Sequence, residues 1–404
     1  MTTHPSLPHI DSIALLRALE SAGLQVVVVT TGGGSLAIPH LLATPGASSV
    51  MLECLAPYAR AAVDRLLGGP QESYCSSRAA RRLAVMAWQR GCGLEAPPAT
   101  VIGVAVTASL RSRTPKNGPH RIVVALHGLN TTSVATLVLR KEARSRNEEE
   151  IVAATLLLER LATIAEGPLR SPPSSSLLLL EDEHVEIECC EPPSAWQELL
   201  AGTRTSVHAS VDSSRQQHAE VVAQAEGSPG AGMLVFPGSF DPLHEGHLRM
   251  AVVAEKIAGR PINFELSVTN VDKPALDYLE MQSRTAQFAG RSLWLTRAAT
   301  FVEKLDVFPQ GTFVMGADTY ARLADPKYYG GSFEATYRAV HQIATRASGL
   351  IVFGRERDGV FEDPRHLDIP PALREVTTFV SQREFQMDIS STALRRQRER
   401  DSTE

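Results

Sequence analysis

The second half of the chain alternates short apolar runs with amphipathic segments, and this alternation limits the folds open to it. The apolar runs have the β-branched and aromatic content of buried strands, and they read MLVFPGS, NFELSV, SLWLT, GTFVMG and GLIVFG. The segments between them, such as residues 243–257 and 334–346, have helical apolar spacing. Strands that alternate with helices form a parallel sheet covered on both faces. We therefore expect a doubly wound α/β domain in this half.

The first half of the chain also predicts an α/β domain. Residues 24–30 (LQVVVVT) and the runs ATVIGVAVTASL and RIVVALHGL are strand candidates, whereas EEEIVAATLLLERLATIAEG has helical spacing and an acidic start. The segment SPPSSS, with other turn-rich stretches after it, is typical of a linker. The expected organisation is a first domain over residues 1–170, a connecting segment with room for short strands over 171–230, and a second domain over 231–404.

Composition and charge exclude several classes of function. The chain has 404 residues, a formal net charge of -5 and five cysteines, with no C-x-x-C pair. No global basic field is available for nucleic acid, and no apolar run reaches the roughly 18 residues of a membrane span. The start lacks a basic segment followed by an apolar core, so no secretory signal is expected. We expect a cytoplasmic protein with a small-molecule partner and without nucleic-acid or membrane partners; self-association into a homo-oligomer stays open.

The motif GSFDPLHEGH lies where the first strand of the second domain meets a helix. In a doubly wound sheet, ligands bind beyond the carboxyl ends of strands, where helix N-termini present free N–H groups. His244 is expected at the helix start, with His247 one turn further on the same face, so that both imidazoles can reach one anion. The N–H groups of Gly238, Ser239 and Phe240 can join them, and Gly246 leaves room for a nucleotide. This arrangement suits an α-phosphate undergoing in-line displacement.

A second motif, MDISSTALRR, lies near the C-terminus. It places three hydroxyl side chains, Ser390, Ser391 and Thr392, before a short basic helix. Hydroxyls and N–H groups at a helix start can hold the β- and γ-phosphates of a nucleotide. Arg395, one turn further, adds a charge-assisted contact. The spacing H-E-G-H differs from the H-E-x-x-H of zinc enzymes, so we expect no metal held by protein ligands.

Taken together, GSFDPLHEGH and ISSTALR resemble the nucleotidyltransferase superfamily, and the variant I-S-S-T-x-x-R most resembles the nicotinamide or nicotinate mononucleotide adenylyltransferases. The resemblance covers about residues 233–398 and implies a Rossmann-like fold, with ATP as substrate and Mg²⁺ as cofactor. It implies that His244, His247 and Arg395 are catalytic. It also implies nucleotide or phosphate contacts on the segments VTNVDKP, VMGADTYARL and IVFGR, through Lys273, Gly316, Asp318 and Arg355.

Several of these residues also have a purely structural interpretation. Asp318 can instead be a helix N-cap, Lys273 a solvated surface residue, and Trp294 a core aromatic rather than a platform for a base. At the level of function, the acceptor can be phosphopantetheine, a phosphosugar or a phosphoalcohol, with ATP or CTP as donor. A non-enzymatic nucleotide sensor or scaffold is the third hypothesis.

The first domain resembles the C-terminal domain of the competence-damage-inducible family over about residues 8–168. The matching stretches include PGAS at 45–48, PYA at 57–59 and GVAVTASL. That family deamidates nicotinamide mononucleotide, which would place both domains near NAD biosynthesis. Aligned without gaps, however, the family's nucleophilic serine falls on Thr31, its cysteine on Gly32 and its lysine on Val63. We therefore expect no amidase activity, and Gly32, Gly33 and Gly34 can form an anion-binding loop. The alternative is that the gapless register is off by a residue and that Thr30 or Ser35 is the nucleophile.

Overall fold

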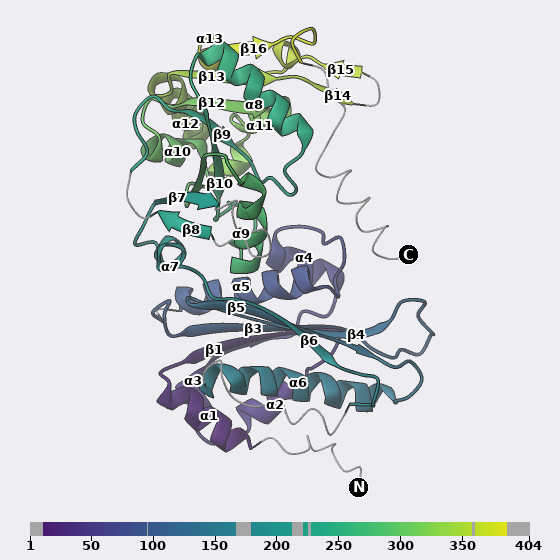
Figure 1. Cartoon of the computed structure of the whole chain (residues 1–404). Coiled ribbons are helices and arrows are strands. Elements are labelled where there is room, and N and C mark those ends of the chain that lie inside the picture. Colours follow the sequence, from purple (N-terminus) through teal and green to yellow (C-terminus); the bar gives the residue numbers. More distant parts are fainter. Residues whose placement is uncertain are drawn as a thin grey trace. The chain divides into compact units, whose positions relative to one another are not determined.

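The computed structural model describes residues 11–94, 96–166, 179–211, 221–224, 228–357 and 360–385. The chain divides into two compact units, which we call unit 1 and unit 2. Unit 1 consists of Met1–Pro192 with Asp272–Leu279, and unit 2 of Pro193–Val271 with Glu280–Glu404. Each unit contains one large sheet with helices packed on it, which confirms the predicted pair of α/β domains (Figure 1). Within the described residues, no helix is long and apolar enough to cross a membrane.

The sheet of unit 1 has six strands in the order β2-β1-β3-β4-β5-β6. Their bounds are β1 Gln25–Thr31, β2 Met51–Leu55, β3 Val101–Ser109, β4 His120–Gly128, β5 Thr131–Leu139 and β6 Val185–Cys190. β1 runs parallel to both of its neighbours, whereas β3 to β6 are antiparallel. Of the parallel strands, β1 and β3 carry the β-branched residues of strands that are buried on both faces, whereas β2 at the edge is only partly buried.

Helices cover both faces of this sheet. One face is covered by α1 (Ser12–Ser21), α2 (Ala37–Leu42), α3 (Ala47–Val50) and α6 (Arg146–Glu166), and the other by α4 (Arg60–Leu67) and α5 (Ser77–Gly93) (Figure 1). The alternation of side chains along β1 explains the two cores. Val26 and Val28 belong to the core under α1 and α6, and Val27 and Val29 to the core under α4 and α5.

Unit 1 also contains a segment that the sequence places far downstream, Asp272–Leu279. Asp277 is buried in an ion pair with Arg81, with 2.8 Å between the charged atoms. The fully buried Tyr278 donates its hydroxyl to the carbonyl of Leu129 over 2.5 Å, and its ring lies against His127. The segment is therefore an integral part of the unit 1 core.

The sheet of unit 2 has eight strands in the order β16-β13-β12-β9-β10-β11-β7-β8. Six of them are parallel: β9 (Leu234–Pro237), β10 (Ile262–Ser267), β11 (Leu293–Thr296), β12 (Thr312–Gly316), β13 (Gly349–Phe353) and β16 (Thr377–Val380). An antiparallel hairpin of β7 (Ser206–Val211) and β8 (Val221–Gln224) extends the edge at β11. This is the expected doubly wound sheet with an antiparallel addition.

The helices of unit 2 connect these strands. They are α7 (Ser194–Ala201), α8 (Glu245–Ala258), α9 (Tyr278–Thr285), α10 (Phe301–Val307), α11 (Ala317–Arg322), α12 (Phe333–Arg346) and α13 (Pro371–Glu375). Short 3₁₀ turns, η2 (Ala286–Phe288), η3 (Pro326–Tyr329) and η4 (Pro364–His366), lie between them, and β14 (Arg355–Arg357) pairs with β15 (Val360–Glu362) in a separate hairpin. α9 begins in the segment assigned to unit 1 and continues into unit 2.

The segment 171–230 is divided between the two sheets. β6 joins the sheet of unit 1, whereas α7, β7 and β8 belong to unit 2, which begins at Pro193. β7 pairs with β11 through four residues on each strand, from Ser206 with Thr296 to Ala209 with Leu293. The sheet of unit 2 is therefore completed by residues that precede position 231.

The strand order of unit 2 identifies where a ligand should bind. From β9 the chain moves to β10 and β11 on one side, and then returns to β12 on the other side of β9. In an open α/β sheet, the crevice beyond the carboxyl ends of the two strands at such a reversal binds ligands. Here those strands are β9 and β12, which end at Pro237 and Gly316.

Candidate functional site

The loop that follows β9 is anchored by a buried aromatic ring. Phe240 is 1% exposed and packs edge-on against Phe236, Phe264 and Phe288, with ring centroids 5.1 to 5.6 Å apart. Its φ of 44° lies in the left-handed region, which non-glycine residues rarely adopt. A Cβ on Gly238 would lie 2.6 Å from the Phe240 ring, so only glycine fits there. The packing of the Phe240 ring therefore fixes the conformation of the loop after β9.

Two side chains from the region of α9 also hold this loop, through hydrogen bonds to its backbone. The buried Arg284 donates to the carbonyl of Ser239 over 3.0 Å and pairs with Glu280 at 2.8 Å. Gln287 donates to the carbonyl of Phe240 over 3.1 Å and accepts from the N–H of Leu243 over 2.8 Å. Sequence reasoning missed Arg284 and Gln287, because each lies more than 40 positions from the loop and belongs to neither motif.

The two histidines lie together at the start of α8, as predicted. His244 is the N-cap residue and His247 lies one turn further, with the two rings stacked at 3.7 Å between centroids. The backbone N–H of His244 donates to Nδ1 of His247 over 3.3 Å. Because Nδ1 accepts this bond, the proton of the neutral ring is on Nε2. His247 thus carries a fixed Nε2–H donor.

Both imidazoles are held in the neutral form. Burial, together with the neighbouring His244, lowers the pKa of His247 from 6.5 to about 3, and burial also lowers the pKa of His244. Within the described part of the chain, the buried Nδ1 of His244 has no hydrogen-bond partner. A buried polar atom without a partner is unfavourable.

Gly246 has a local structural role in addition to the expected nucleotide contact. A Cβ at this position would lie 3.0 Å from Nδ1 and Cε1 of His244. The absence of a side chain therefore lets the His244 ring lie over the first turn of α8. The nucleotide contact itself stays a prediction.

The second strand at the reversal point presents Gly316 and Asp318. Gly316 is the N-cap of α11 and has open space where its Cβ would be. Asp318 is exposed in the first turn of α11, where a carboxylate is favourable for the helix dipole. The alternative interpretation of Asp318 as the N-cap is wrong, because that position belongs to Gly316.

The remaining predicted site residues belong to other segments of the chain. Lys273 is exposed, and it belongs to the Asp272–Leu279 segment of unit 1. Arg355 begins β14, directly after the end of β13. Ser390, Ser391, Thr392 and Arg395 lie outside the described residues, so the second motif stays a prediction. Trp294 is 7% exposed and packs edge-on against Phe308, which confirms it as a core aromatic.

A buried ion pair lies beneath the β9 loop. The Glu265 carboxylate on β10 accepts from Nζ of Lys304 at 2.8 Å and from the Thr296 hydroxyl at 2.5 Å. The backbone carbonyl of Glu265 accepts the N–H of Gly238 over 3.0 Å. The ion pair is therefore linked to the β9 loop through the backbone of Glu265. Among the residues that the structure describes, no three His, Cys, Asp or Glu side chains gather so that they could hold a metal ion.

In unit 1, the glycine loop after β1 binds a carboxylate of the chain itself. Gly32 and Gly34 have φ values of 77° and 80°. Glu150 of α6 accepts from the hydroxyl of Ser35 over 2.9 Å and from the N–H of Leu36 over 3.2 Å. Val63, at the position of the family's lysine, is buried in the core. In the described structure, the Thr31 hydroxyl has no hydrogen bond to a basic group or carboxylate.

Residues 235–397 match the cytidylyltransferase-like family model. The second half therefore contains a cytidylyltransferase-like domain of the nucleotidyltransferase superfamily. No curated protein matches the chain.

Solved structures of competence-damaged protein (CinA) superfamily proteins match the N-terminal part of the chain. The one from Escherichia coli has 15% identity and a TM-score of 0.33, covering 39% of this chain and 95% of that chain. The one from Enterobacter cloacae has 16% identity and a TM-score of 0.33, and the match covers 41% of this chain and 98% of that chain. The competence/damage inducible protein CihA from Agrobacterium tumefaciens has 22% identity and a TM-score of 0.34, and the match covers 40% of this chain and 100% of that chain.

Proposed function

We propose that unit 2 transfers the adenylyl group of ATP to nicotinamide or nicotinate mononucleotide and releases pyrophosphate, a reaction of cytoplasmic NAD biosynthesis. The observation that carries this proposal is the stacked pair of neutral histidines at the point where the strand order reverses. The acceptor is taken from the resemblance of ISSTALR to the mononucleotide adenylyltransferases. The description of the matching family favours CTP as the second donor to test.

In the proposed reaction, a phosphate oxygen of the mononucleotide attacks the α-phosphorus of ATP. A new P–O bond forms while the bond to the bridging oxygen of the β-phosphate breaks, and pyrophosphate leaves with the electron pair. Negative charge spreads over the α-phosphoryl oxygens during this step. Nε2–H of His247 would donate to one of those oxygens, and its fixed tautomer means that no reorganisation is needed. His244 would supply a second contact.

The rest of the chain would position the substrates. Phe240, Arg284 and Gln287 contact the β9 loop and would hold its backbone in place around the phosphate. The N–H groups of Ser390 to Thr392 and the side chain of Arg395 would hold the β- and γ-phosphates. Mg²⁺ usually binds through substrate phosphates and water, so it would arrive with ATP and offset part of the triphosphate charge.

The lowered pKa of His247 predicts the pH dependence of the reaction. A group with a pKa of about 3 is already neutral at pH 6 and above, so its titration cannot change kcat/KM between pH 6 and 8. We expect the kcat/KM profiles of the wild type and of His247→Asn to differ by a constant factor over this range. A step near pH 6.5 in the wild type that the variant lacks would show that His247 acts as a protonated imidazolium.

Unit 1 is expected to have no amidase activity. Among the described residues, no base contacts the Thr31 hydroxyl, and the carboxylate of Glu150 accepts from Ser35 and Leu36 directly after the glycine loop. The full chain should therefore release no ammonia from nicotinamide mononucleotide in a coupled ammonia assay. Ammonia release that Thr31→Ala abolishes would contradict this expectation and assign a second activity to the protein.

A further inference from the structure

An arginine-lined pocket in unit 1 adjoins the glycine loop through Arg146 and takes no part in the proposed reaction. It has a volume of about 560 Å³ and lies between the loop after β3 and the loop after β5. Its lining residues are Arg111, Ser112, Arg113, Glu142, Ala143, Arg144, Ser145 and Arg146. Four arginines and one glutamate give this lining a formal charge of +3.

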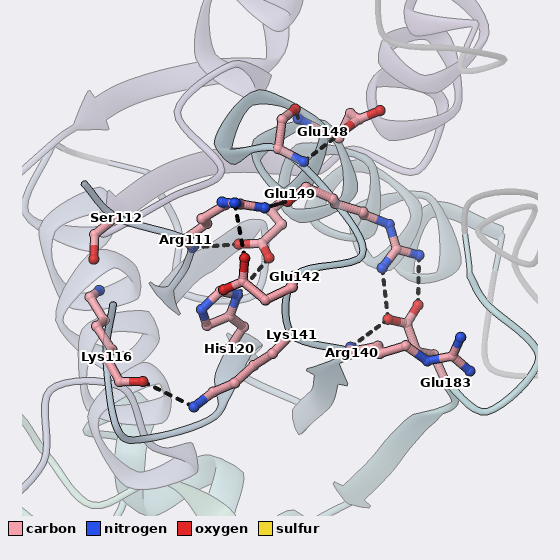
Figure 2. A network of polar contacts seen from close by, with 12 residues as sticks. Arg111, Ser112, Lys116, His120, Arg140, Lys141, Glu142, Glu148, Glu149 and Glu183 are labelled. Atoms are coloured by element: carbon pink, nitrogen blue, oxygen red, sulfur yellow. Dashed lines mark hydrogen bonds and ion pairs between the residues drawn. The ribbon is translucent and has the colours of Figure 1, made fainter. Parts of the chain in front are cut away.

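Contacts on three sides fix the position of Arg111. Its backbone N–H donates to Glu149 over 2.5 Å, and its guanidinium donates to the carbonyl of Arg144 over 2.9 Å and pairs with Glu142 at 2.9 Å. The other carboxylate oxygen of Glu149 lies 2.6 Å from Nδ1 of the buried His120. Figure 2 shows Arg111, Glu149 and His120 as one continuous network. The arginine is therefore held in place before any ligand binds.

The other guanidinium groups are also tethered to carboxylates. The buried Arg144 makes two bonds of 2.7 Å to Glu183. Arg146 pairs with Glu150 at 3.0 Å and donates to the carbonyl of Gly32 over 3.2 Å. A guanidinium has five N–H donors in a rigid fork, so these tethers orient the group for a further acceptor.

Glu142 occupies the position in the pocket that a ligand anion would take. Its side chain is 67% exposed, and its carboxylate contacts Arg111. Its φ of 62° lies in the left-handed region, which costs a non-glycine residue about 1 kcal/mol or more. An exposed ion pair contributes little free energy, so a stronger anion can displace this carboxylate from Arg111.

We propose that this pocket binds a small phosphorylated polyanion, with the phosphoryl groups held by Arg111 and Arg113 after displacement of Glu142. Guanidinium groups bind phosphate in bidentate geometry, and the volume is within the usual range for small-molecule sites. Among the described lining residues, Ala143 is the single residue with an apolar side chain, so charged and hydroxyl groups supply the contacts of the pocket. The ligand class is therefore a compact polyphosphate or phosphorylated polar molecule.

The test is calorimetric titration of the full chain with inorganic pyrophosphate at constant low ionic strength. Arg113→Ala and Arg111→Ala should each weaken binding by about tenfold or more, the effect of losing one charge-assisted contact. Glu142→Gln should strengthen binding several-fold. Arg140→Ala is the matched control, because Arg140 is exposed and pairs with Asp182 rather than lining the pocket; Figure 2 draws its side chain beside Glu183. It should change the affinity less than twofold.

Hydrogen exchange locates the bound pyrophosphate, since pyrophosphate is also the product proposed for unit 2. Protection over residues 111–118 and 142–146 that disappears in Arg113→Ala is the expected result. Protection confined to residues 238–247, with affinities unchanged in Arg113→Ala and Glu142→Gln, would overturn the proposal while leaving the proposed function intact. Absence of any binding would also overturn it. Because Arg113 is exposed, we expect Arg113→Ala to fold normally. A melting temperature equal to that of the wild type checks this.

Discussion

His247→Ala is expected to lower kcat by about 100-fold or more while the protein stays folded. The reason is that Nε2–H of His247 is a preoriented donor, and removal of one such donor to a developing charge typically costs about 3 kcal/mol of barrier. The ring is only partly buried, so its truncation leaves the core formed by Phe236, Phe240 and Phe264 in place. The measurement is the rate of pyrophosphate release with saturating ATP and mononucleotide.

Two further variants separate catalysis from folding in this experiment. His341→Ala removes an exposed histidine of α12 in the same unit and should leave kcat within about twofold of the wild type. His247→Asn keeps a side-chain N–H and should recover part of the lost rate. A kcat of His247→Ala close to that of His341→Ala would remove His247 from the mechanism.

Lys304→Met is expected to destabilise unit 2 by about 3 to 5 kcal/mol, the range for breaking a buried ion pair. The substitution leaves the carboxylate of Glu265 buried with the Thr296 hydroxyl and without a cation. An uncompensated buried charge is costly, whereas a well-packed apolar pair is not. Urea unfolding followed by tryptophan fluorescence measures the change in the free energy of unfolding, because Trp196 and Trp294 are both buried in this unit.

The double variant Glu265→Leu with Lys304→Met distinguishes charge burial from packing. It should recover much of the lost stability, because no unpaired charge stays in the core. Lys256→Met, an exposed lysine in the last turn of α8, is the control and should cost less than about 1 kcal/mol. Equal destabilisation by Lys304→Met and Lys256→Met would mean that the buried pair contributes little to the fold.

The parts of the site that are local in sequence could be predicted from it. The strand before Gly238, the helix after His244 and the spacing of the two histidines all follow from apolar periodicity and turn residues within a dozen positions. The reversal of strand order could not be read in this way, because it depends on which strands pair. The hydrogen bond to Nδ1 of His247, and with it the tautomer, depends on the helix cap geometry.

Long-range contacts explain what sequence reasoning missed. Nothing near Arg284 or Gln287 indicates that they hold a loop more than 40 residues earlier. β5 was not predicted, because polar residues such as Thr132 and Ser133 interrupt the apolar pattern of a strand. Thr132 is nevertheless buried, where its hydroxyl contacts His127. β7 precedes the expected boundary at 231 because an edge strand with mixed polarity resembles a linker. Asp272–Leu279 likewise carries no local sign that it belongs to unit 1.

The most direct test of the proposed function is a screen for pyrophosphate release by the full chain. ATP and CTP are each combined with nicotinamide mononucleotide, nicotinate mononucleotide, phosphopantetheine, a phosphosugar and a phosphoalcohol, in the presence of Mg²⁺. We expect release with ATP and a pyridine mononucleotide, formation of the matching dinucleotide, and loss of both in His247→Ala. Release with a different acceptor would leave the chemistry in place and contradict the assigned substrate. No release from any combination, with both nucleotides still bound, would contradict the central claim that unit 2 is a nucleotidyltransferase.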